Sequence, residues 1–112
     1  MMSYNEQFCP SFQHAVELLG KRWTGLILKV LLAGPQRFSE IADQIEGVSD
    51  RMLSERLKEF EAEGVIERRV YPETPVRIEY RLTEKGQALD SVIEAIATWS
   101  HQWIEAEPAL VE

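Results

Sequence analysis

The 112-residue sequence contains a single cysteine, Cys9. One thiol cannot form a disulfide within the chain, which excludes the disulfide-stapled scaffolds of small secreted proteins. Long apolar runs are also missing: Lys29 interrupts the longest candidate, residues 26–33, and a membrane-spanning helix needs about 20 apolar residues. Residues 1–7 are polar and lack the apolar region of a signal peptide. These absences predict a cytoplasmic protein that forms a single domain over residues 1–112.

The patterns that carry catalysis or metal binding are missing as well. The sequence has no phosphate-cradling glycine loop, no nucleophile elbow and no Ser-His-Asp set. His14 and His101 have no recognisable ligand spacing with Cys9, so both are expected to be ordinary core or surface histidines. The sequence therefore predicts no enzyme, no metal and no cofactor.

Positive charge is scarce, because 12 Lys and Arg stand against 19 Asp and Glu, a formal net charge of -7. That balance opposes nucleic-acid binding, since phosphate neutralisation supplies much of the affinity. The distribution of charge weakens the objection: residues 86–112 hold five acidic side chains and no Lys or Arg, whereas residues 37–85 hold nine basic and twelve acidic. Any DNA contact must therefore rest on a few cations presented on one face.

Apolar residues at helical spacing predict two helices near the start of the sequence. Pro10 suits the first turn of a helix that ends near Gly20, with Cys9 at its N-cap. A second helix over residues 23–32 is apolar on most sides, so it is expected to be central to the core, and a Gly-Pro pair stops it.

Two further helices have the spacing of a helix-turn-helix. After a very short extended piece at Phe38, Ser39 is the expected N-cap of a helix running to about Glu46. Ser49 caps the next helix, which ends at Gly64. Three of its apolar residues recur at i, i+4 and i+7 and form a buried stripe: Leu53, Leu57 and Phe60.

Residues 65–71 and 76–82 are rich in β-branched and aromatic side chains and predict a hairpin, with a proline at each end of the connecting turn. In the second run apolar and charged residues alternate, so one face is expected to pack and the other to meet solvent. Thr83 is the expected cap of a long final helix. Its apolar positions step by three and four residues and form a narrow seam: Leu89, Val92, Ile96, Trp99 and Trp103.

This order of elements predicts a mainly α fold with a small β-hairpin (α+β), a winged helix-turn-helix whose second helix can enter a DNA major groove. Its DNA-binding core covers about residues 37–86, and dimerisation helices lie at about 10–20 and 83–106. A winged helix closes its core near Leu82, so a long amphipathic helix beyond that point needs a partner. We therefore expect a homodimer.

Several stretches resemble one known family. Cys9-Pro10, LGKRWTGLIL (19–28), RFSEI (37–41), MLSERLKEFEAEGVIERRVY (52–71), PVRIEYRLTEKG (75–86) and Trp99 occur in this order. Together they are similar to the HxlR-type transcription regulators of bacteria and archaea, relatives of the MarR winged helices. The wing departs slightly, because the family often has two adjacent prolines where this chain has Thr74-Pro75.

The resemblance implies a sequence-specific transcriptional regulator, more a repressor than an activator, that binds operator DNA as a homodimer. Dimer contacts would come from the first and last helices: Phe12, Val16, Leu89, Val92, Ile96, Trp99 and Trp103. DNA contacts would come from the helix-turn-helix and the wing: Ser39, Ser49, Arg51, Ser54, Lys58 and Arg77.

Some of these arginines have a competing structural interpretation. Arg51 has Glu55 four residues later on the same helix and could simply pair with it. Arg77 could pair with Glu67 or Glu79 across the hairpin. Strand alternation puts Arg68 and Arg69 on opposite faces and leaves open which of them meets DNA.

Cys9 has two interpretations. At a helix N-cap, free amide groups and the helix dipole favour a thiolate and lower its pKa. In HxlR-type proteins a cysteine at this place is associated with sensing oxidants or electrophiles, sometimes by a disulfide between subunits. The alternative is an inert thiol buried beside Phe8 and Phe12.

Two other functions fit the sequence. One is a regulator that responds to a small molecule in a dimer cleft, lined by Trp23, Trp99 and Trp103. The other is a winged-helix module that binds protein and not DNA, which the acidic net charge would allow. A salt-dependent gel shift separates the second from a DNA-binding regulator.

Overall fold

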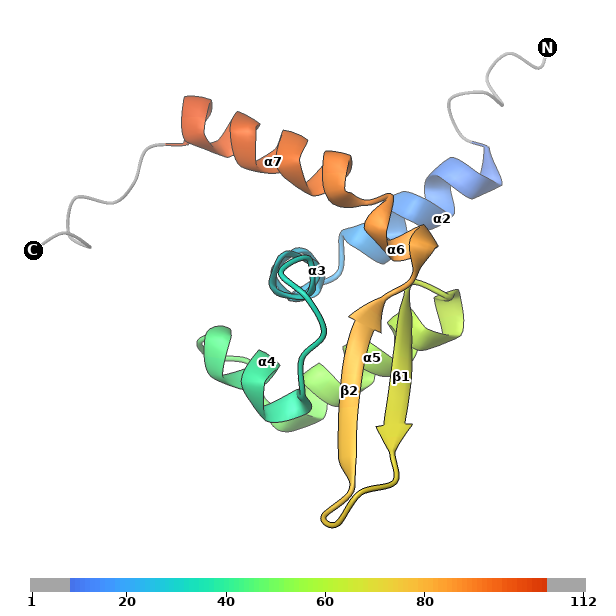
Figure 1. Cartoon of the computed structure of the whole chain (residues 1–112). Helices are drawn as coiled ribbons and strands as arrows, with labels where there is room; N and C mark the ends of the chain where they lie inside the picture. Colours follow the sequence, from blue (N-terminus) through green and yellow to red (C-terminus); the bar gives the residue numbers. More distant parts are fainter. Residues whose placement is uncertain (1–8, 105–112) are drawn as a thin grey trace, which may run out of the picture.

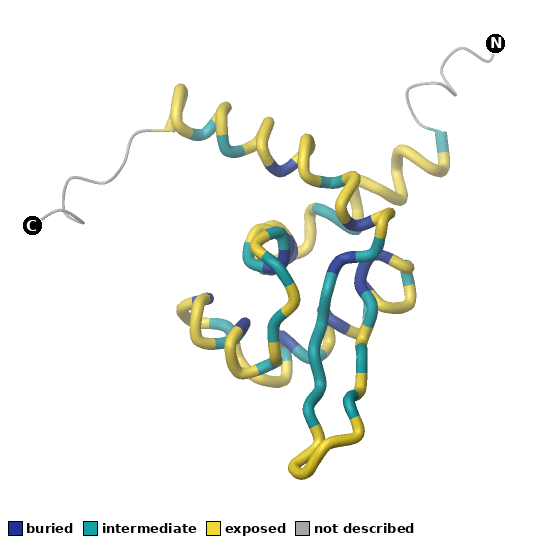
Figure 2. Tube along the Cα trace, in the orientation of Figure 1, coloured by how far each residue is buried: buried dark blue, intermediate teal, exposed yellow. Residues whose placement is uncertain are grey.

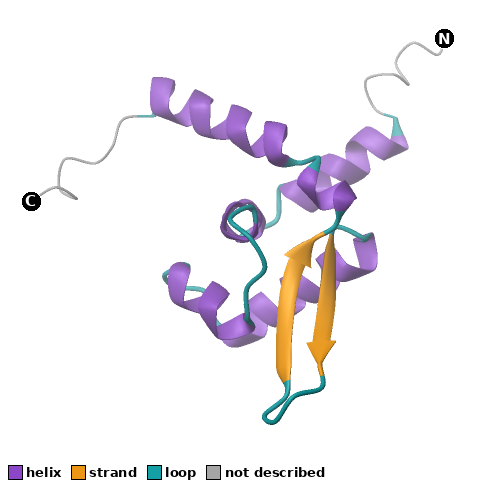
Figure 3. Ribbon diagram, in the orientation of Figure 1, coloured by secondary structure: helices purple, strands orange, loops and turns teal. Residues whose placement is uncertain are grey.

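The computed structural model describes residues 9–104, and its elements follow the predicted order (Figure 1). The chain begins with α2 (Pro10–Leu19), α3 (Thr24–Leu31), α4 (Phe38–Gln44) and α5 (Asp50–Glu63). The strands β1 (Ile66–Tyr71) and β2 (Arg77–Leu82) follow, and α6 (Glu84–Gln87) and α7 (Asp90–Trp103) complete the described part. Figure 3 shows helices around one two-stranded hairpin, which is the predicted α+β winged helix. Residues 105 and 106 of the predicted last helix lie outside the described residues.

The core forms around α3, which α4, α5 and the base of the hairpin surround (Figure 2). The predicted stripe of α5 is confirmed, because Leu53, Leu57 and Phe60 are each at most 1% exposed. The flanking helices contribute little: α2 has no buried residue, and α7 has only Ile93. Helix α3, the helix-turn-helix of α4 and α5, and the hairpin therefore form the packed body, and α2 and α7 lie at its periphery.

The boundaries of α5 were predicted correctly, because both are set locally. The Ser49 hydroxyl accepts a hydrogen bond from the Met52 N–H at 3.0 Å. At the other end Gly64 has φ 81°, a left-handed conformation in which glycine is favoured. The helix that leads into the wing is thus capped at both ends.

The helix before it begins differently from the prediction. Arg37, not Ser39, is the N-cap of α4, and its backbone N–H donates to Glu40 Oε1 at 2.8 Å. Phe38 is the first helical residue, and the short extended piece lies at Gln36, which pairs with Tyr80 through two backbone hydrogen bonds of 3.0 and 2.8 Å. The Glu40 carboxylate thus bonds the N–H of the cap residue itself, and Ser39 lies exposed in the first turn.

The predicted long final helix is broken in two. Thr83 caps the four-residue α6, where its Oγ1 accepts from the Gly86 N–H at 3.2 Å, and α7 starts only at Asp90. Gly86 lies so close to the residue before β1 that a Cβ there would be 2.2 Å from the Val65 carbonyl oxygen. Thr83 Oγ1 also lies 2.6 Å from the Gly64 carbonyl and 3.1 Å from that of Val65. These contacts hold α6 against the base of the hairpin, so the chain must turn before α7 can begin.

Candidate nucleic-acid interface

The exposed side of α5 carries three of the predicted DNA contacts. Arg51 is 88% exposed, and its only ion pair among the described residues is with Glu55, Nε to Oε2 at 3.3 Å. Lys58 is exposed two turns further along the helix, and Ser54 lies half-buried between them. An exposed pair of this kind is weak, so the Arg51 guanidinium can exchange its carboxylate for another anion.

A hollow of about 420 Å³ separates α5 from the hairpin and brings a further cation into this surface. It is lined by Ser54, Leu57, Lys58, Glu61, Arg68 and Tyr80. Arg68 points to the α5 side, because it lines this hollow together with Tyr80, its partner across the hairpin. Within residues 9–104 neither Arg68 nor Lys58 makes an ion pair. Arg68, the residue that sequence alternation could not assign, thus joins the predicted α5 residues.

The other face of the hairpin carries a ladder of ion pairs. Glu67 bridges two arginines, with its Oε2 3.0 Å from Arg69 Nη2 and its Oε1 3.2 Å from Arg81 Nε. These hydrogen bonds, that from Arg69 first, hold the pKa of the Glu67 carboxyl below its usual value. We call this surface, made by Glu67, Arg69, Arg77, Glu79 and Arg81, the outer face, and the Arg68 side the inner face.

Arg77 belongs to the outer face, where its guanidinium is paired with carboxylates; its predicted DNA contact stays a prediction. Its Nη2 lies 2.9 Å from Glu73 Oε2, its Nη1 lies 2.6 Å from Glu79 Oε2, and its guanidinium stacks 3.9 Å from the centroid of the Tyr71 ring. The bond to Glu73 is the main reason that the pKa of Arg77 is raised, and the same bond lowers the pKa of Glu73. The pairing with Glu79 that competed with DNA contact is therefore what the structure shows.

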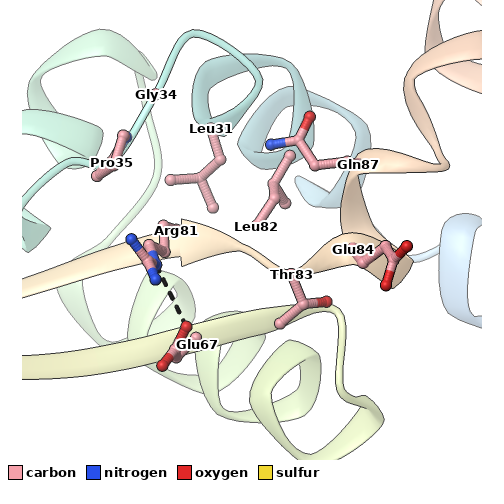
Figure 4. A pocket seen from close by; sticks show the side chains of 9 residues that line it. All are labelled: Leu31, Gly34, Pro35, Glu67, Arg81, Leu82, Thr83, Glu84 and Gln87. Carbon is pink, nitrogen blue, oxygen red and sulfur yellow. Dashed lines mark hydrogen bonds and ion pairs between the residues drawn. The ribbon is translucent and has the colours of Figure 1, made fainter.

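A second hollow, of about 410 Å³, opens near the base of the hairpin, beside the loop between α3 and α4 (Figure 4). Two carboxylates, Glu67 and Glu84, and one guanidinium, Arg81, line it, and Figure 4 shows Arg81 bonded to Glu67. Its lining has no uncommitted cation, so a phosphate would be repelled there. Among the hairpin arginines of the described residues, Arg68 on the inner face is the one without a carboxylate partner.

Arg56 is a cation of α5 that sequence reasoning did not single out. Only 13% of its side chain is exposed, its Nε donates to the Arg22 carbonyl at 3.0 Å, and its Nη1 lies 3.3 Å from Glu59. It ties α5 to the segment before α3 and has a structural role. The available signal was its place directly before Leu57, at the edge of the buried stripe.

Ser39 and Ser49 lie at the starts of the two helices of the motif. The Ser49 hydroxyl accepts the Met52 N–H, and its own proton stays available for a phosphate oxygen. Ser39 is exposed on α4. Neither position contradicts the predicted DNA contact, which stays a prediction.

Cys9 is the N-cap of α2, as predicted. Its Sγ accepts from the Phe12 N–H at 3.4 Å and lies 3.5 Å from Ser11 Oγ. The hydrogen bond with Ser11, followed by that from Phe12, lowers the pKa of the thiol below its ordinary value. The thiol is half-exposed, which disagrees with the buried, inert alternative; Phe8, named in that alternative, lies outside the described residues.

The predicted dimer contacts are apolar and mostly exposed. Phe12 and Val16 on α2, and Val92, Ile96, Trp99 and Trp103 on α7, are 38–67% exposed. Leu89 differs, because it is half-buried against the core of its own chain. Within one chain Trp23 and Trp99 line separate hollows, and Trp103 lines neither of them; the cleft between two subunits that these tryptophans would line stays a prediction.

Other sites were searched for over the same residues. Between residues 9 and 104 no three His, Cys, Asp or Glu side chains form a group that could hold a metal ion. His14 instead contacts the last residue of α5, with Nε2 2.9 Å from Glu63 Oε1, and this contact lowers the pKa of Glu63. None of the described helices has the length and apolarity to cross a membrane.

Comparison with known proteins places these features in a family. The HxlR-like helix-turn-helix family model matches residues 18–108. The uncharacterized HTH-type transcriptional regulator YvaP of Bacillus subtilis is 54% identical over 99 residues, which cover 88% of this chain and 92% of YvaP. The HTH-type transcriptional regulator YodB of the same organism is 49% identical over 104 residues, 93% of either chain.

Solved structures agree with these sequence matches. The reduced form of YodB has a TM-score of 0.78 and 52% identity, over 87% of this chain and 95% of that one. YodB has also been solved diamide-treated and quinone-bound. The redox regulator HypR in its oxidized form has a TM-score of 0.80 and 30% identity, over 88% of this chain and 100% of that one.

Proposed function

Because the chain belongs to the HxlR-like helix-turn-helix family of transcriptional regulators, we propose that it is a cytoplasmic homodimer that binds operator DNA and represses transcription. The observation that carries the proposal is the surface between α5 and the inner face of the hairpin. Lys58 and Arg68 line its hollow together with one carboxylate, Glu61, and neither cation has an ion-pair partner among the described residues; Arg51 lies exposed two turns before Lys58 on the same helix.

This surface supports a definite mode of binding. With α5 in the major groove, Arg51 in its first turn reaches base edges or phosphate, and Lys58 in its third turn meets the backbone. Arg68 meets phosphate from the hairpin side of the same hollow. Ser49 and Ser39 donate hydroxyl protons to phosphate oxygens at the starts of α5 and α4. Three cations per subunit, six per dimer, offset the unfavourable net charge locally.

Operator binding is tested by fluorescence anisotropy on the DNA upstream of the protein's own gene. With six phosphate-neutralising cations, affinity is expected to fall by about a thousandfold between about 50 and about 200 mM salt. A protein-interaction module would show no such binding at low salt. Weak binding that changes little with salt would contradict the DNA-binding proposal and favour that alternative.

The homodimer rests on the apolar surfaces of α2 and α7. Phe12, Val16, Val92, Ile96, Trp99 and Trp103 are too large and too exposed, on two peripheral helices, for an isolated chain. A second copy would cover them and set the spacing of two α5 helices. Sedimentation at micromolar concentration should give twice the chain mass, and a monomeric mass would contradict the proposal.

Cys9 gives the regulator its switch. The half-exposed thiol with a lowered pKa has the reactive form that attacks an electrophile, and the neighbour YodB has been solved with quinone and after diamide. Addition to a quinone forms an S–C bond; the thiol proton ends on one ring oxygen and the hydrogen of the attacked ring carbon moves to the other, giving a hydroquinone thioether. Diamide instead oxidises two thiols to a disulfide and is itself reduced to a hydrazine. With one cysteine per chain, that disulfide must join two chains or one chain and a small thiol.

The switch is tested by adding a quinone or diamide to the operator complex. We expect release of DNA by the wild type and none by Cys9→Ser, which keeps an N-cap oxygen and loses the thiol. Non-reducing electrophoresis and mass spectrometry identify the adduct. Equal release from both proteins would rule out Cys9.

A further inference from the structure

Most of helix α2 has no apolar support from its own chain. Residues 10–17 are all exposed (Figure 2), and we call them the exposed part of α2. Only the last turn packs on the core, through the half-buried Leu18 and Leu19. Because a short helix depends on packing for its place in a protein, the direction of α2 within one chain has to be fixed by polar contacts.

The C-terminal end of α2 is attached to α5 by residues that follow the helix. The Arg22 carbonyl accepts a hydrogen bond from Arg56 Nε at 3.0 Å. Lys21 Nζ lies 3.4 Å from Glu59 Oε1, and Arg56 Nη1 lies 3.3 Å from the same oxygen. This end of α2 therefore has a fixed place beside α5.

His14 provides a second point of attachment. Its Nε2 lies 2.9 Å from Oε1 of Glu63, the last residue of α5. In the part of the chain that the structure describes, this is the one hydrogen bond or ion pair that joins the exposed part of α2 to another element. Glu59 and Glu63 are four residues apart and share one face of α5. Two points on one helix face determine the direction of α2.

The direction of α2 matters because this helix carries part of the proposed dimer surface. Phe12 and Val16 lie on its exposed part, whereas α5 is fixed in the body of its own chain by its buried stripe. A change in the direction of α2 would therefore move α5 relative to a second copy. Two recognition helices reach two half-sites only when their separation matches one helical turn of DNA or a multiple of it.

We propose that His14 and Glu63 are positioning residues, whose bond fixes the direction of α2 on α5 and so sets the separation of the two α5 helices in the dimer. The inference rests on the proposed homodimer. Neither residue is among the proposed DNA or dimer contacts. The two side chains are 61% and 26% exposed, so the bond favours the observed direction by about fivefold.

Pulsed electron paramagnetic resonance measures the separation on the full chain, with one spin label per subunit at Glu55→Cys on α5 and with Cys9→Ser to remove the other thiol. We expect one narrow distance distribution. His14→Ala should broaden it, whereas His14→Gln, whose amide can still donate to Glu63, should keep it narrow. Glu94→Ala, which removes a carboxylate of α7 that has no ion pair among the described residues, is the matched control and should change nothing.

Hydrogen exchange shows whether the bond acts on α2 itself. The α2 amides should exchange about fivefold faster in His14→Ala and in Glu63→Ala than in the wild type. The double variant should exchange no faster than the faster single variant, because both changes remove the same bond. Glu61→Ala removes a neighbouring carboxylate on the hairpin side of α5 and should leave these rates unchanged.

Several results would overturn the proposal. One is an unchanged distance distribution in His14→Ala, and another is an α2 exchange rate in His14→Ala equal to that of the wild type. Equal broadening in Glu94→Ala and His14→Ala would mean general loosening and would overturn it as well. A wild-type sample without a dipolar signal would contradict the homodimer, and this inference with it. None of these measurements uses DNA, so their outcome does not depend on operator binding.

Discussion

On the outer face of the hairpin, Arg69, Arg77 and Arg81 each bond to a carboxylate, and Arg77 bonds to two. On the inner face Arg68 lies beside Lys58, and neither has a carboxylate partner among residues 9–104. The three paired arginines of the outer face therefore present less available positive charge than the single unpaired Arg68 of the inner face. The difference explains how a chain of net charge -7 can still offer phosphate a cationic surface, because counts of charged residues do not distinguish committed from free cations.

The inner face keeps its position only if the hairpin stays packed against α5. Phe60 is buried under β1, and its carbonyl accepts the Val65 N–H at 2.9 Å. We expect Phe60→Ala to lower the free energy of unfolding by about 3–5 kcal/mol, because it leaves a cavity between α5 and the hairpin. Urea denaturation measures this. Glu61→Ala, the exposed neighbour, should leave the midpoint nearly unchanged, and an equal loss in both would mean that Phe60 does not support the hairpin.

Next, the two faces should differ in operator binding. Lys58→Ala or Arg68→Ala is expected to weaken affinity about tenfold and to lower the salt dependence by about two released ions per dimer. Arg69→Ala removes the same charge from the same strand, but its guanidinium is already bonded to Glu67, so affinity should change far less. Anisotropy at several salt concentrations measures both quantities. Equal losses of operator affinity from Arg68→Ala and Arg69→Ala would mean that the two faces do not differ in DNA binding.

The smallest expected effect is a change in how stability depends on pH, and it concerns only the outer face. The pKa of Glu67 is lower in the folded chain than in the unfolded one, chiefly through Arg69. Its stabilising contribution is therefore complete above the unfolded pKa and is lost as the pH falls through the folded pKa. Urea midpoints measured from about pH 6 to about pH 3 should fall less steeply in Glu67→Gln than in the wild type. Glu94→Gln, on α7, serves as the control, and identical slopes in all three proteins would contradict the assignment.

Elements whose ends are set by neighbouring residues were predictable from the sequence. Ser49 and Gly64 define α5, and apolar alternation gave the hairpin to within a residue of its observed bounds. Cys9 was correctly placed as an N-cap by the proline that follows it. Each of these signals lies within about four residues of its consequence.

The features that the sequence did not reveal depend on contacts across space. The break after α6 follows from the close approach of Gly86 to the Val65 carbonyl oxygen. The spacing of apolar residues in the sequence gives no sign of this contact. The ion pair of Arg77 with Glu73 forms because the turn of the hairpin brings Glu73 back beside Arg77. Whether Arg68 or Arg69 faces α5 depends on which face of the strand packs toward that helix. Local pattern gave the candidates, and tertiary packing decided among them.

The Thr83 hydroxyl lies within hydrogen-bond distance of two carbonyls and one amide, from the end of α5, the start of β1 and the turn of α6. One oxygen atom thus joins three segments at the point where the hairpin meets the flanking helix. Serine can replace it, whereas valine, which has nearly the same shape, would leave all three backbone groups without that partner. The place where the wing ends and the flanking helix begins therefore depends on a single hydroxyl group.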